Sequence, residues 1–191
     1  MAKTDSAARK NHRSNMIKWV ITIFFTTIVI SGVISLVSDE VMANSSLPVA
    51  FGILMAIIFL GILFDIVGMA VATADEKPFH SMAARKVPGA QEAIRLLRNA
   101  ERVSSICNDV VGDICGVVSG SASATIAALI LVSADVAWPK AVSLLMSALV
   151  AGLTVGGKAI GKNIAVKSCT SIVHTVGKLL HVLSFRKTKK K

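Results

Sequence analysis

Four apolar stretches, each long enough to cross a lipid bilayer, constrain this sequence more than any other feature. A membrane-spanning helix needs about 20 mostly apolar residues. The first stretch has no charged residue and starts at Trp19, a residue type enriched at membrane–water interfaces. We therefore predict an all-α fold, a polytopic integral membrane protein with four transmembrane helices. The expected spans cover residues 19–37, 48–74, 103–132 and 136–157.

The first stretch has an alternative interpretation as a cleaved signal peptide. It follows a basic segment, and Val41-Met42-Ala43 resembles a cleavage site. However, its apolar run is longer than the roughly 7–15 residues of a signal peptide, and the acids Asp39 and Glu40 directly precede the site. We expect an uncleaved helix that follows a basic cytoplasmic N-terminus over residues 1–18.

The basic residues predict how these helices are oriented. The chain carries 21 Lys and Arg against 11 Asp and Glu, although 53% of it is hydrophobic. All basic residues except Lys140 fall before the first stretch, between the second and third, or after the fourth. Cytoplasmic segments of membrane proteins carry an excess of Lys and Arg. We therefore expect both termini in the cytoplasm and the protein in the plasma (inner) membrane. This segregation also argues against a nucleic-acid partner, which needs the basic residues on one shared surface.

Two segments outside the spans have the pattern of amphipathic helices. Residues 75–102 predict a cytoplasmic juxtamembrane helical hairpin that breaks at Val87-Pro88-Gly89, because the residue before a proline avoids the α conformation. Residues 166–191 predict a basic amphipathic C-terminal helix. Such segments bind anionic lipid, so the lipid bilayer is an expected partner.

Acidic side chains within the spans are the candidate functional residues, because a charge inside a membrane is costly. The second stretch contains Asp65, an acid whose role the sequence does not assign. In the third stretch Ser105, Asp109 and Asp113 follow at intervals of four, which predicts one polar stripe on a helix. Carboxylate and hydroxyl oxygens favour hard cations such as Mg²⁺, and no Cys/His cluster indicates zinc or copper. The acids are interpreted either as an ion-binding site or as structural pairs around a water-filled crevice.

Small residues also recur on the third and fourth stretches, as on faces where membrane helices approach closely. The sequence has no nucleophile–base pair, phosphate-binding glycine loop or metalloprotease motif. We therefore expect neither an enzyme nor a bound nucleotide. The predicted helix-packing residues are Gly112, Gly116, Gly120, Gly152 and Gly156.

A series of short motifs runs through residues 48–165. Thr73-Ala74-Asp75-Glu76 ends the second stretch, the predicted hairpin follows, Cys107-Asn108 opens the third stretch, and Gly157-Lys158-Ala159-Ile160-Gly161-Lys162 ends the fourth. In order and spacing they resemble the transmembrane domain of the CorB/CorC/cyclin M family of magnesium and cobalt transporters. That family has Ser-x-Ser-Glu, a hairpin, Gly-Asn and Gly-Glu-Ile-Leu-Pro-Lys at these places.

The resemblance implies a homodimeric core that binds Mg²⁺ between its helices. It implies Thr73, Asp75, Glu76 and Asn108 as the residues that bind the metal. The chain departs from the family pattern by its additional first helix and by the short segment after the last span. That segment is too short for the family's nucleotide-binding regulatory domains, so we expect a short form without them.

A third departure from the family concerns the cation site itself. Lys158 stands where the family has a glutamate, and an ammonium group there competes with a cation. We expect Lys158 to form an intramembrane ion pair with Asp75, Asp109 or Asp113.

The first interpretation is a transporter-like membrane protein that binds and translocates Mg²⁺, or a similar divalent cation such as cobalt, through a polar cleft between helices. The alternative is a non-transporting membrane regulatory or structural module whose intramembrane acids pair with Lys158. A third interpretation is a pore-forming or membrane-stress protein whose basic tail binds lipid.

Overall fold

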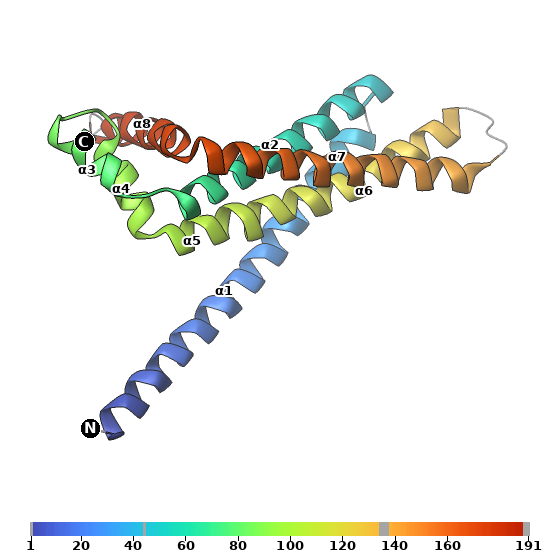
Figure 1. Ribbon diagram of the computed structural model, residues 1–191. Helices are drawn as coiled ribbons and strands as arrows, with labels where there is room; N and C mark the ends of the chain where they lie inside the picture. The colour runs from blue at the N-terminus through green and yellow to red at the C-terminus, as the bar shows by residue number, and fades with distance from the viewer. Residues whose placement is uncertain (1, 44, 134–137, 189–191) are drawn as a thin grey trace.

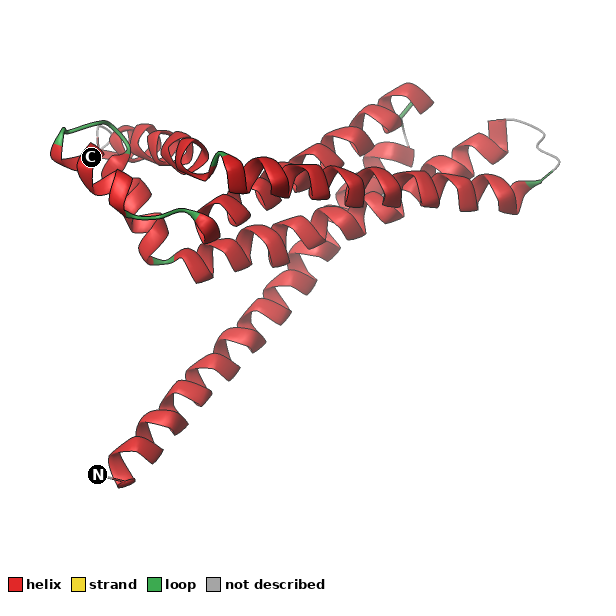
Figure 2. Cartoon of the chain, in the orientation of Figure 1, coloured by secondary structure: helices red, strands yellow, loops and turns green. Residues whose placement is uncertain are grey.

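The computed structural model describes residues 2–43, 45–133 and 138–188, and every regular element in these ranges is a helix (Figure 1; Figure 2). Short turns connect the helices of the hairpin, and a segment of π-helix, η1, interrupts the third membrane-spanning region. The elements are α1 (Ala2–Ala43), α2 (Leu47–Thr73), α3 (Lys77–Ala84), α4 (Ala90–Arg98), α5 (Ala100–Ser105), η1 (Ile106–Gly112), α6 (Asp113–Ser133), α7 (Pro139–Lys167) and α8 (Cys169–Thr188).

Four helical regions in the described ranges are long and apolar enough to cross a membrane, which confirms the predicted all-α membrane fold. They are Trp19–Met42, Leu47–Thr73, Ala100–Val132 and Pro139–Lys167. Prolines lie in the first turns of α2 and α7, where their missing N–H costs no helical hydrogen bond.

The first and fourth predicted helices differ most from the prediction in their boundaries. Helix α7 continues to Lys167 instead of ending near residue 157, since no proline follows the glycine pair Gly156-Gly157 and the helical hydrogen bonds continue. Lys158 therefore lies inside a helix and not at its end. Helix α1 begins at Ala2, so the basic N-terminal segment continues the first apolar helix.

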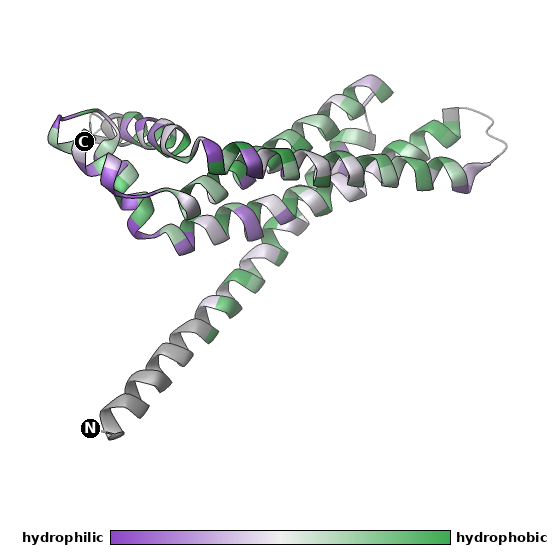
Figure 3. Cartoon of the chain, viewed as in Figure 1, coloured by the Kyte–Doolittle hydropathy of each residue, from purple (hydrophilic) through white to green (hydrophobic). Residues whose placement is uncertain are grey.

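Helices α2, α6 and α7 pack against one another, whereas α1 crosses α6 and diverges from the bundle toward the N-terminus (Figure 1). The hairpin of α3 and α4 packs with α8 at one end of the bundle, and both termini lie toward that end. Hydrophilic residues concentrate there, while the long helices are mostly hydrophobic (Figure 3).

Two of the three apolar clusters among the described residues connect the largest number of helices through their buried members. One, which includes Leu54 and Ile126, joins α1, α2, α6 and α7. The other, which includes Val71 and Phe79, joins α2 and α7 to the hairpin and α8. Asp65 lies on α2 between the parts of the helix that contribute to these clusters, and only 4% of this residue is exposed.

The turn of the hairpin depends on Gly89. Its φ of 86° lies in the left-handed region, and a Cβ atom there would come within 2.5 Å of the backbone nitrogen of Lys178. The backbone of the turn thus packs directly against α8, where Gly177 faces it. This contact places the C-terminal helix on the hairpin.

Candidate functional site

A buried ion pair joins α2 to α7 in the middle of the bundle. Lys158 Nζ lies 3.2 Å from Asp65 Oδ2, and the two side chains are 20% and 5% exposed. An isolated charge in this position would be strongly unfavourable, so each group neutralises the other. The pair forms because Asp65 faces inward between Gly61 and Gly68 on α2, and both glycines are in close contact with the third span.

The π-helix η1 completes the surroundings of the lysine. Lys158 Nζ donates a hydrogen bond of 3.1 Å to the carbonyl oxygen of Gly112, the last residue of η1. A Cβ atom at position 112 would collide with Asp65 Oδ1, so glycine lets the carboxylate approach the backbone. π-helical turns inside α-helices often occur at functional sites, because they alter the usual pattern of backbone hydrogen bonds.

Asp113 contributes a second carboxylate. Its Oδ1 lies 3.8 Å from Lys158 Nζ, and its side chain is 71% exposed. Of the three partners expected from the sequence, Asp113 is the one that the structure brings to the lysine. Asp65, which was not among those partners, lies closer and is far more buried. The ammonium is thus surrounded by oxygen atoms from α2, η1 and α6.

The residues implied by the family resemblance have local roles at the end of α2. Thr73 Oγ1 donates a hydrogen bond of 2.8 Å to a carbonyl oxygen one turn earlier in α2. Asp75 Oδ1 accepts one of 3.2 Å from the backbone N–H of Lys77, and Glu76 lies 3.3 Å from His80. In the part of the chain that the structure describes, no three His, Cys, Asp or Glu residues are close enough to hold a metal ion.

Asn108 differs from that set because its side-chain oxygen is buried. Asn108 Oδ1 lies against Gly68 and has no hydrogen-bond partner among the described residues. Asp109, the next residue, is exposed. Both lie in η1, so the α-helical spacing that predicted one stripe of Ser105, Asp109 and Asp113 does not apply across this segment.

The predicted packing glycines behave differently from one another. Within the chain, Gly112 is in close contact with a neighbouring helix, but Cβ atoms added to the other four would meet nothing within 4 Å. No neighbouring helix of the same chain lies that close to those four positions, so their role in helix packing stays a prediction. Sequence spacing shows that small residues share a face but not whether another helix covers it. The four uncovered glycines are Gly116, Gly120, Gly152 and Gly156.

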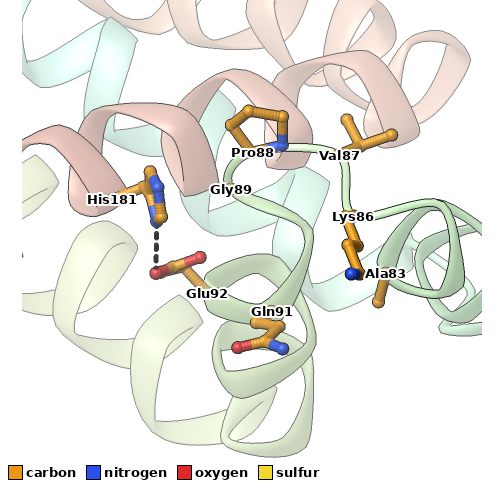
Figure 4. A pocket seen from close by; sticks show the side chains of 8 residues that line it. All are labelled: Ala83, Lys86, Val87, Pro88, Gly89, Gln91, Glu92 and His181. Atoms are coloured by element: carbon orange, nitrogen blue, oxygen red, sulfur yellow. Dashed lines mark hydrogen bonds and ion pairs between the residues drawn. The ribbon is translucent and has the colours of Figure 1, made fainter.

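A second polar contact lies at the hairpin end of the molecule. Glu92 Oε1 on α4 lies 2.8 Å from His181 Nδ1 on α8, at the edge of a cavity of about 240 Å³ (Figure 4). The hydrogen bond from His181 lowers the pKa of Glu92, although partial burial opposes this shift. This contact and the Gly89 turn both join α8 to the hairpin.

The geometry defines a class, an all-α integral membrane protein with a charged centre among its helices. Comparisons with protein-family models, with curated proteins and with solved structures found no match.

Proposed function

We propose that this chain is a transporter-like membrane protein that binds a divalent cation, magnesium or cobalt, in the polar centre between α2, α6 and α7. The observation that carries this proposal is the oxygen-lined site of Asp65, the Gly112 carbonyl and Asp113, which already holds one positive charge, the Lys158 ammonium. Two carboxylates and a carbonyl are the donors that hard divalent cations prefer, with water as the remaining ligands.

The burial of Asp65 supports a cation as its partner. A carboxylate in the middle of a membrane bundle must be neutralised by a proton, an ammonium or a metal ion. Each of these partners can replace another. If the bundle were held by apolar packing alone, no carboxylate would be needed at position 65. Movement of the ion would follow from alternate opening of the bundle around this site.

The distribution of charge supports a cytoplasmic hairpin. The hairpin, α8 and both termini lie toward one end of the bundle, and this end carries most of the basic residues. By the positive-inside rule we place it in the cytoplasm and the protein in the plasma (inner) membrane.

A second candidate is a non-transporting membrane module in which the Asp65–Lys158 pair is permanent. It is favoured by the fact that Lys158 already satisfies both Asp65 and the Gly112 carbonyl. In this case the pair specifies helix packing, and no cation takes part.

Titration of the purified protein with MgCl₂ distinguishes the two candidates. Thermal unfolding in detergent should shift upward with MgCl₂ but not with NaCl at equal ionic strength, because a ligand that binds only the folded state stabilises it. Asp65→Asn should abolish the shift, and Glu101→Gln, which neutralises an exposed acid on α5, should retain it. Magnesium uptake into liposomes should likewise be lost in Asp65→Asn and retained in Glu101→Gln. Absence of both the shift and the uptake would establish the permanent pair instead.

A further inference from the structure

Helix α8 has one covered side and one exposed side. On the covered side Val173 is fully buried in the cluster with Phe79, and Gly177 packs directly on the turn of the hairpin. On the other side Leu179 and Leu183 are 60% and 62% exposed. These two leucines lie four residues apart, so they share one side of the helix. Within the described ranges the hairpin therefore covers the inner side of α8 and leaves large apolar side chains exposed on its outer side.

Helix α8 begins where α7 reaches the surface of the membrane. Helix α7 has 29 residues, which at about 1.5 Å per residue gives a length of about 44 Å. This length matches a bilayer together with its headgroup regions, about 40–45 Å. Ser168 separates the two helices, and its non-helical backbone (φ −119°, ψ 22°) lets α8 turn out of the direction of α7 (Figure 1). The start of α8 is therefore expected at the depth of the lipid headgroups.

Three lysines around this junction have no acidic partner in the part of the chain that the structure describes. Lys162 and Lys167 on α7 and Lys178 on α8 are exposed, and none of them forms an ion pair there. The sequence explains this, because residues 136–191 contain no Asp or Glu. Unpaired ammonium groups beside exposed leucines match a surface on which phosphate groups lie over hydrocarbon, since lysine side chains place an apolar stem in lipid and their charge at the headgroups.

The charges favour anionic lipid over a second copy of this chain as the partner of the outer side of α8. Two copies that met through this side would place lysines against lysines, and like charges in contact are unfavourable. Anionic headgroups neutralise the lysines, while the boundary between headgroups and acyl chains accepts the leucines.

We propose that the outer side of α8, together with Lys162 and Lys167 of α7, binds anionic phospholipid headgroups of the adjacent leaflet. Leu179 and Leu183 enter the acyl boundary, and the lysines contact the phosphates. Helix α8 is then held between the leaflet and the hairpin. Because Gly177 packs directly on the hairpin turn, this attachment also fixes the hairpin relative to the membrane. The inference does not depend on the proposed cation site.

Fluorescence quenching in lipid nanodiscs tests this surface in the full chain. In a background with the native cysteines replaced by alanine, Leu183→Cys carries a bimane label and the discs contain spin-labelled lipid. Quenching should be strong in discs of phosphatidylglycerol with phosphatidylcholine and weaker in phosphatidylcholine alone. Equal quenching in both lipids would overturn the binding of anionic headgroups, and no quenching in either would overturn the docking of α8. Oxidative cross-linking of unlabelled Leu183→Cys into dimers would also overturn it, since a second copy would then cover this side.

Charge variants of the labelled protein test the lysines. Lys178→Gln should lower the ratio of lipid-attached to detached α8 about fivefold in the anionic discs, and its combination with Lys167→Gln roughly 30-fold. Lys140→Gln removes the same charge at the other end of α7 and should leave the quenching unchanged. Equal quenching in all these variants would overturn the role of the lysines.

Hydrogen exchange of the unmodified protein tests the surface even if the cysteine-free background does not fold. Backbone amides of Cys169–Leu183 should exchange more slowly in the anionic discs than in phosphatidylcholine discs. Inorganic phosphate added to phosphatidylcholine discs should not slow the exchange, since it offers no apolar layer for the leucines. Equal exchange in the two lipids would overturn the proposal. Full protection by inorganic phosphate would overturn it as well, because the site would then bind free phosphate.

Discussion

The carboxylate of Asp65 occupies the space that a side chain at Gly112 would need, so that one acid of α2 lies directly on the backbone of the third span. The same glycine offers its carbonyl oxygen to Lys158. Three helices therefore meet at Gly112, Asp65 and Lys158. Substitution of these residues gives the first two predictions.

Replacement of Gly112 by alanine should destabilise the protein by about 1–3 kcal/mol, since the added methyl group collides with Asp65. The measurement is the thermal midpoint of the purified protein in detergent. Gly116→Ala is the control, because a Cβ atom there meets nothing within 4 Å, and it should change the midpoint little. Equal effects of the two substitutions would contradict the close contact.

The ion pair itself predicts a strong coupling between its partners. Asp65→Asn leaves a buried ammonium without its closest counter-charge and should cost about 3–5 kcal/mol. The double variant Asp65→Asn with Lys158→Met removes both charges and should recover much of this loss. A double-mutant cycle measured by thermal or denaturant unfolding gives the coupling. Additive effects would show that the two side chains do not interact.

The contact between Glu92 and His181 predicts that the folded protein becomes less stable at acidic pH. Because the pKa of Glu92 is lowered in the folded state, its stabilising contribution is complete above the ordinary value of 4.5. It is lost as the pH falls below that value through the lowered pKa. The loss should be about 1 kcal/mol or less, since the contact is partly exposed.

The check is the thermal midpoint between about pH 6 and about pH 3. Glu92→Gln should flatten this part of the pH profile, whereas Glu101→Gln should leave it as in the wild type. An unchanged profile in Glu92→Gln would assign the acid sensitivity to other groups.

Gly89→Ala should release α8 from the hairpin. The substitution places a side chain at a φ of 86° and against the backbone of Lys178, at a cost of about 1–3 kcal/mol. Limited trypsin digestion should then cut after Lys178 faster than in the wild type. Gly52→Ala, where the added Cβ atom meets nothing within 4 Å, should digest at the wild-type rate.

The orientation of the bundle predicts which loops reagents reach from outside the cell. In a background free of other cysteines, Ser46→Cys, which precedes α2, should react with an impermeant maleimide in intact cells. Ser81→Cys in the hairpin should react only after the membrane is permeabilised. The reverse pattern would invert the topology.

The sequence by itself determined the four spanning regions and the helical hairpin, because length, hydropathy and proline or glycine breaks are local properties of the chain. It also showed that acids lie within the apolar segments and that Lys158 directly follows the fourth of them. It did not show the extension of α7 to Lys167 or the π-helix at Ile106–Gly112, since both depend on how backbone hydrogen bonds continue inside a packed bundle.

Only the tertiary structure decided which charges meet. Asp65 and Lys158 are far apart in the chain, and helical periodicity assigns each to a face without saying which face another helix covers. The same limit explains the glycines: Gly112 receives the Asp65 carboxylate, whereas Gly116 and Gly120 line an open groove. A buried charge is unfavourable unless a counter-charge lies close to it in the folded protein. The packing of α2, η1 and α7 places Lys158 next to Asp65.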